Sequence, residues 1–94
     1  MEGLQLLTDF YETIAADARI GVTHTCLYIA LLHEQSLCAG QDSIYINRHT
    51  LMKKVKISRR TYNRCMHELR EYGYIQYEPS SNPLVGSRVF LNRL

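Results

Sequence analysis

The chain has 94 residues, of which 46% are hydrophobic and 21% are charged. This length supports one hydrophobic core and excludes an enzyme with a substrate cleft between two domains, so we expect a single domain over residues 1–94. The formal net charge of +2 at first suggests that no partner is strongly charged. We expect no membrane span, because no apolar stretch is long enough. The three cysteines form no C-x-x-C pair, which is typical of free thiols in a reducing cytoplasm.

The first predicted helix runs from Thr8 to Ala18, with Thr8 as its N-cap. Apolar residues at spacings of three and four predict one amphipathic stripe, made of Leu4, Leu7, Tyr11, Ile14 and Ala18. Phe10 adds apolar surface beyond this stripe. Two interpretations of this surface stay open: ordinary core packing, or a homodimer interface through residues 4–18.

A second helix is predicted from His24 to Cys38, capped by Thr23 and closed by Gly40. Its run C-L-Y-I-A-L-L is apolar nearly all round, which is typical of a central, buried helix. Residues 1–40 would therefore form an N-terminal helical part. A short strand is predicted next, at residues 43–46, where alternation places the two isoleucines on one face and the tyrosine on the other.

Residues 47–73 predict a helix-turn-helix unit. Asn47 can cap a short helix over residues 48–54, and Ser58 can cap a longer one over residues 59–72, which Gly73 terminates. The expected inward residues of the two helices and their connection are Leu51, Met52, Val55, Ile57, Tyr62, Cys65, Met66, Leu69 and Tyr72.

The last part of the chain, residues 74–91, predicts a β-hairpin. Residues 74–78 and 87–91 alternate between apolar and polar, and a loop rich in Pro, Ser and Gly separates them. The expected fold is mainly α with a small β-hairpin, in the order helix, helix, strand, helix, helix, strand, strand.

The segment S-R-R-T-Y-N-R-C-M-H-E-L-R-E-Y-G-Y-I, from Ser58 to Ile75, resembles the recognition helix and first wing strand of winged helix-turn-helix DNA-binding domains. The matching positions are Ser58, Thr61, Arg64, Met66, Leu69, Gly73 and Ile75. Tyr62 departs from the pattern, because that family usually has a smaller valine or isoleucine there. The resemblance covers residues 43–91 and implies duplex DNA binding with the hairpin as the wing. The whole chain also resembles, less specifically, small winged-helix proteins of Bacteroidetes mobile elements, which implies a bacterial source.

Charge separates along the chain. Residues 1–47 contain one basic residue and six acids, a net charge of −5, whereas residues 48–94 contain ten basic residues and three acids, a net charge of +7. Seven of the ten lie between Arg48 and Arg64, where no acid occurs. Lysine and arginine clustered on one motif are typical of phosphate binding. The charge pattern therefore supports a DNA partner independently of the resemblance.

The expected roles follow from position on the motif. The base-contacting candidates, on the outward face of the longer helix, are Arg59, Arg60, Asn63, Arg64 and His67, with Arg64 serving either bases or phosphate. The phosphate-contacting candidates are Arg48, Lys53, Lys54, Lys56, Ser58 and Thr61. The wing candidates are Ser80, Ser81, Asn82 and Arg88. The hairpin either contacts DNA or only closes the core.

These observations predict a cytoplasmic, sequence-specific double-stranded DNA-binding protein that regulates transcription. The alternatives are a protein-interaction winged helix in a replication or recombination assembly, and the DNA-binding part of a plasmid replication initiator. We expect no enzyme activity and no cofactor, because no nucleophile–base pair or glycine-rich phosphate loop occurs. We expect no metal, because the three cysteines and four histidines lack the spacing of a metal finger.

Overall fold

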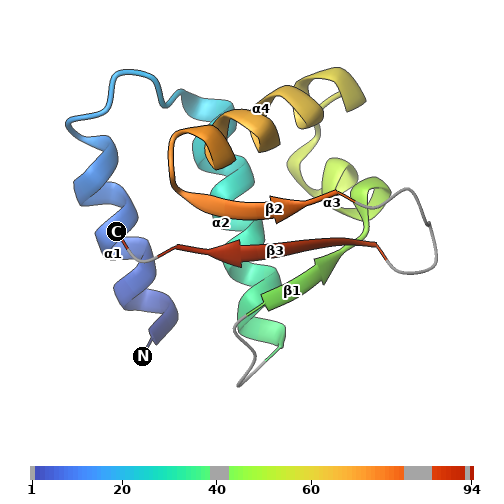
Figure 1. The fold of residues 1–94 in the computed structure, drawn as a ribbon, viewed down its shortest axis with the longest axis horizontal. Helices are drawn as coiled ribbons and strands as arrows, with labels where there is room; N and C mark the ends of the chain where they lie inside the picture. Colours follow the sequence, from blue (N-terminus) through green and yellow to red (C-terminus); the bar gives the residue numbers. More distant parts are fainter. Residues whose placement is uncertain (1, 39–42, 80–85, 93) are drawn as a thin grey trace.

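The computed structural model describes residues 2–38, 43–79, 86–92 and 94 (Figure 1). The helices are α1 (Glu2–Ile14), α2 (Val22–Leu37), α3 (Arg48–Val55) and α4 (Arg59–Glu71), and the strands are β1 (Ser43–Ile46), β2 (Ile75–Glu78) and β3 (Ser87–Leu91). The described residues thus form a mixed α/β structure of four helices and a three-stranded sheet. The order of elements along the chain is the predicted one.

The sheet is larger than the predicted hairpin. Strand β3 lies in the middle and pairs antiparallel with both β1 and β2, so that Val89 faces Ile44 on one side and Tyr77 on the other. The predicted hairpin is confirmed by the pairing of β2 with β3, and the expectation missed only that the separately predicted strand, β1, joins it in one sheet. The pairing of β1 with β3 joins segments far apart in the sequence, and periodicity within each segment carries no information about it.

Helix α2 forms the centre of the core, as its apolar composition predicts. It lies behind the sheet in Figure 1 and packs against α1, α3, α4 and β1. Leu27, Tyr28 and Leu31 are fully buried. The ring of Phe10, from α1, stacks on the Tyr28 ring with centroids 3.9 Å apart and planes 7° from parallel. This stack fixes how α1 meets α2.

Helix α1 differs from its prediction in bounds and in buried face. It begins at Glu2 rather than Thr8, and the Thr8 hydroxyl donates to the carbonyl of Leu4 inside the helix instead of capping it. The predicted stripe is wrong at Leu4, which is 62% exposed, and at Tyr11, which is 49% exposed, whereas its member Ile14 packs against the core and Phe10 is fully buried. The contact with Tyr28 turns the Phe10 face inward, which the spacing of apolar residues alone does not reveal.

The ends of the other helices lie close to their predicted positions. Helix α2 is capped by Gly21 rather than Thr23 and ends at Leu37; the predicted terminator, Gly40, lies outside the described residues. Helix α4 ends at Glu71, one residue early, and Gly73 follows with a φ of +89°, a left-handed conformation that glycine adopts without strain. Among the described residues, no helix has the length and apolar character needed to cross a membrane.

Candidate nucleic-acid interface

The α3–α4 unit is built by two capped helices joined by a tight turn. The Asn47 side chain accepts a hydrogen bond from the Thr50 amide at 3.1 Å, and the Ser58 hydroxyl accepts one from the Thr61 amide at 3.2 Å, so both predicted caps are confirmed. Between the helices, Lys56 adopts a left-handed φ of +62°, and its amide donates to the Met52 carbonyl at 2.8 Å. This turn sets the angle at which α4 leaves α3.

Helix α4 separates a buried face from an exposed one. The predicted inward residues Tyr62, Cys65, Met66 and Leu69 are all fully buried, and Tyr72 is half-buried. The predicted base-contacting residues lie on the remaining surface: Arg59, Arg60, Arg64 and His67 are exposed, and Asn63 is half-buried. The structure therefore places these five side chains on the non-core face of α4, with four of them exposed to solvent.

The cations of this region differ in their ion pairing. Lys54 Nζ lies 2.6 Å from Glu34 Oε1 on α2, and Arg64 Nε lies 3.6 Å from Glu68 Oε1 one turn along α4. With the residues that the structure describes, Lys53, Lys56, Arg59 and Arg60 form no ion pair. Their charges are thus the ones most open to an external anion.

Three predicted phosphate-contacting residues are partly buried or hydrogen-bonded within the protein. Arg48 is half-buried, and its Nε is fully buried with no hydrogen-bond partner among the described residues. Its charge acts on the nearby Tyr62 phenol, whose pKa is nevertheless raised because burial outweighs that charge. The Ser58 hydroxyl donates to Thr61 Oγ1 at 3.0 Å, so both hydroxyls serve the helix cap.

Of the predicted wing residues, Arg88 lies on β3 and the other three lie outside the described residues. Arg88 is half-buried on β3, where its guanidinium lies 4.8 Å from the Phe90 ring centroid and its Nε donates to Ser43 Oγ at 3.3 Å. Its Nη1 is also 4.0 Å from Glu78 Oε2. Ser80, Ser81 and Asn82 fall outside the described residues. Arg88 is therefore held by neighbouring strands rather than extended into solvent.

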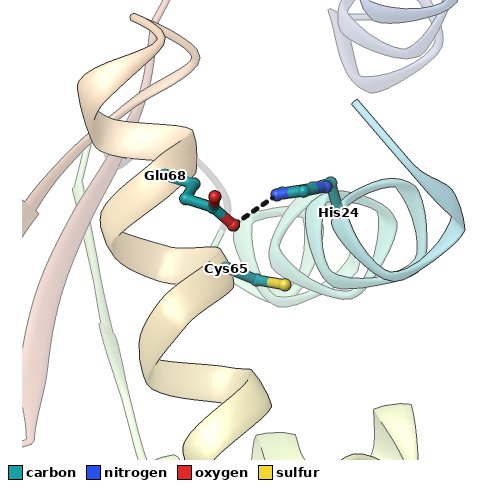
Figure 2. A group of neighbouring side chains, drawn as sticks. All are labelled: His24, Cys65 and Glu68. Atoms are coloured by element: carbon teal, nitrogen blue, oxygen red, sulfur yellow. Dashed lines mark hydrogen bonds and ion pairs between the residues drawn. The ribbon is translucent and has the colours of Figure 1, made fainter. Parts of the chain in front are cut away.

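A second cluster joins α2 to α4 on the buried side of the same helix. His24, Cys65 and Glu68 approach one another there, and His24 Nε2 lies 3.0 Å from Glu68 Oε1 (Figure 2). Sequence spacing does not reveal this group, because His24 and Glu68 are 44 positions apart. The only local sign is that Cys65 and Glu68 are three residues apart on one helix, where they share a face.

A scan of the sequence against models of known protein families finds no match, and a search among curated proteins finds no relative.

Proposed function

We propose that this chain is a winged helix-turn-helix protein that binds double-stranded DNA through the exposed face of α4 and regulates transcription by occupying its site. The observation that carries the proposal is the group of exposed cations Lys53, Lys56, Arg59 and Arg60 around the capped start of α4, which form no ion pair with the described residues. Cations without an internal partner attract the phosphate backbone and release its counterions.

The dimensions of α4 suit the major groove. A helix of 13 residues is about 20 Å long and, with side chains, about 10–12 Å wide, close to the roughly 12 Å width of that groove in B-form DNA. Its N-terminal turns carry Arg59, Arg60 and Asn63. The arginine guanidinium can donate two hydrogen bonds to the two major-groove acceptors of guanine, and the asparagine amide can form a pair of hydrogen bonds with adenine. These three residues are the proposed base readers.

In this proposal, the lysines at the end of α3 and in the turn contact the phosphate backbone of the DNA. Lys53 and Lys56 are exposed and flank the start of α4, where contacts with phosphate would fix the register of the helix without reading sequence. Lys54 would exchange its 2.6 Å contact with Glu34 for a phosphate. Arg48 is no longer among the proposed phosphate contacts, because its Nε is buried.

The experiment that tests the proposal is a selection of bound sequences from random duplexes, followed by anisotropy titration of the selected site and a scrambled duplex. Arg60→Ala should weaken binding to the selected site more than binding to the scrambled one. The matched control is Arg70→Ala, which removes the same charge from an exposed position in the last turn of α4, away from the proposed base readers. Failure to select any sequence, with no duplex binding at low salt, would overturn the proposal and favour a protein-interaction module.

A homodimer through residues 4–18 belongs to the same proposal, because paired recognition helices address half-sites one helical turn apart. Phe10 is used by the core, so the exposed apolar side chains left for such a contact are those of Leu4 and Tyr11. Sedimentation equilibrium decides this point. A dimeric wild type that becomes monomeric in Leu4→Asp supports the interface, and a monomeric wild type contradicts it.

A further inference from the structure

The cluster drawn in Figure 2 contains three side chains of metal-binding type. His24 lies in the first turn of α2, and Cys65 and Glu68 lie one turn apart on α4. One atom from each, the His24 imidazole nitrogen, the Cys65 sulfur and a Glu68 carboxylate oxygen, lies within 4.8 Å of the other two. His24 is 8% exposed and Cys65 is fully buried. The Glu68 side chain is 30% exposed and gives the cluster its opening to solvent.

We propose that His24, Cys65 and Glu68 bind one Zn²⁺ ion. A thiolate and an imidazole favour this ion over Mg²⁺ or Ca²⁺, which prefer oxygen ligands. Zn–N, Zn–O and Zn–S bonds of about 2.0–2.3 Å place tetrahedral ligand atoms about 3.3–3.8 Å apart. The present separation of 3.0 Å between His24 and Glu68 and the upper limit of 4.8 Å for the group require shifts of about 1 Å or less.

The protons of the site show what binding must change. The Gly21 amide donates to His24 Nδ1 at 3.1 Å, so the imidazole proton sits on Nε2 and is donated to Glu68. A zinc ion on Nε2 moves that proton to Nδ1, so the hydrogen bond from the Gly21 amide to Nδ1 must break when the ion binds. The S–H bond of Cys65 breaks as the Zn–S bond forms, and its proton leaves to solvent.

Neighbouring groups hold the carboxylate in place. The Tyr72 hydroxyl donates to Glu68 Oε2 at 3.3 Å, which leaves Oε1 facing His24, and an oriented carboxylate binds a metal more tightly than a mobile one. Arg64 Nε, at 3.6 Å from Oε1, competes for the same oxygen and must give way. Three protein ligands leave the fourth position of the ion for water or another ligand.

The test is a titration of the reduced full chain with Co²⁺ and then Zn²⁺. We expect one ion per chain, a thiolate-to-cobalt charge-transfer band, and loss of that band when Zn²⁺ displaces Co²⁺. Cys65→Ser should abolish the band, and His24→Gln and Glu68→Gln should each weaken Zn²⁺ binding at least about tenfold. The matched controls are Cys26→Ser and His33→Gln, both exposed on α2, which should leave the band and the affinity unchanged.

Binding without the charge-transfer band, or no binding, would overturn the site. So would a band that survives Cys65→Ser and disappears in Cys26→Ser, since the ion would then lie on the surface of α2. If Cys65→Ser does not fold, the Zn²⁺ affinity of Glu68→Gln tests the site instead. This variant should fold, because the Glu68 side chain is partly exposed and an amide keeps the shape of a carboxylate. Unchanged Zn²⁺ affinity in that variant contradicts the proposal. None of these readouts requires DNA.

Discussion

The hydroxyl of Tyr74 donates a 2.7 Å hydrogen bond to Oδ2 of Asp17, across 57 positions of sequence. Arg19 holds the same carboxylate through its amide and guanidinium, at 2.8–3.0 Å, and places its guanidinium carbon 4.2 Å from the centroid of the Tyr72 ring. The segment between α1 and α2 is thereby tied to the residues where α4 ends and β2 begins. The acidic N-terminal half of the chain thus supports the position of the basic half.

Protonating Asp17 should loosen this tie. The bonds from Arg19 and then Tyr74 hold the pKa of Asp17 well below its ordinary value, so its contribution to folding is present above about pH 4 and is lost as the pH falls below that value. Asp17→Asn should therefore destabilise the protein at neutral pH and show a smaller loss of stability on acidification. Urea unfolding at about pH 6 and pH 3 measures both effects. Glu12→Gln, at an exposed site on α1, is the control; an acid response of Asp17→Asn equal to that of wild type contradicts the assignment.

Buried phenols should limit stability in alkali. Burial raises the pKa of Tyr28 and of Tyr74 to about 12, from an ordinary value of 10. Because the folded state holds these protons more tightly, the resulting stability is complete below about pH 10 and is lost as the pH rises through 12. Phenolate absorbance and far-ultraviolet circular dichroism, recorded together, should show the last phenols ionising as the helices unfold. Complete ionisation with intact helices would contradict this.

The two tyrosines should respond differently to loss of the hydroxyl at neutral pH. The Tyr28 hydroxyl is buried with no hydrogen-bond partner among the described residues, so Tyr28→Phe should leave the free energy of unfolding unchanged or raise it by up to about 1 kcal/mol. Tyr74→Phe loses the bond to Asp17 and should lower that free energy. Chemical unfolding of both variants tests the contrast, and a larger loss in Tyr28→Phe than in Tyr74→Phe would contradict it.

Phe10 rather than its neighbours should anchor α1. Phe10→Ala removes the stack on Tyr28 and leaves a cavity in the core, which should lower the free energy of unfolding by about 3–5 kcal/mol. Tyr11→Ala, one position along the helix at a side chain 49% exposed, should cost less than about 1 kcal/mol. Urea titrations of the two variants measure the difference. Equal losses would mean that α1 packs in another orientation.

This anchor shows where sequence reasoning fails. Spacings of three and four fit a buried face with Leu4 and Tyr11 as well as one with Phe10. Several apolar residues of α1 compete, and periodicity does not say which face meets α2. The same holds for Thr8, whose hydroxyl suits either a cap or the 3.0 Å bond to the Leu4 carbonyl. Only the aromatic contact with Tyr28 decides the orientation.

The candidate site is more predictable because its signals are local. Asn47 and Ser58 cap their own helices within three residues, and Gly73 supplies the left-handed φ that ends α4, so caps and inward residues follow from sequence alone. The partners of individual side chains cannot be predicted from the sequence in this way. The partial burial of Arg48 depends on tertiary packing, and the approach of His24 to Glu68 depends on how α2 packs against α4, which no local pattern encodes.

The cap at Ser58 should matter for both stability and the interface. Ser58→Ala leaves the Thr61 amide without its acceptor and should cost about 1 kcal/mol, with fraying at the turn that carries Arg59 and Arg60. Ser36→Ala, at an exposed serine that caps no helix, is the comparison. Thermal unfolding gives the energies, and amide hydrogen exchange at residues 59–62 gives the local effect. Exchange that is as slow as in wild type would show that the cap is dispensable.

We propose that the exposed cations around the start of α4 bind duplex DNA. Fluorescence anisotropy of a labelled duplex, titrated with the protein at several salt concentrations, tests this binding directly. We expect the affinity for duplex DNA to fall with salt with a logarithmic slope on the order of 4–6. Lys53→Ala should reduce that slope by about one on every duplex, whereas Arg60→Ala should cost about 1–3 kcal/mol of binding free energy on the preferred site. An absence of duplex binding at low salt, or binding that neither salt nor these substitutions change, would contradict it.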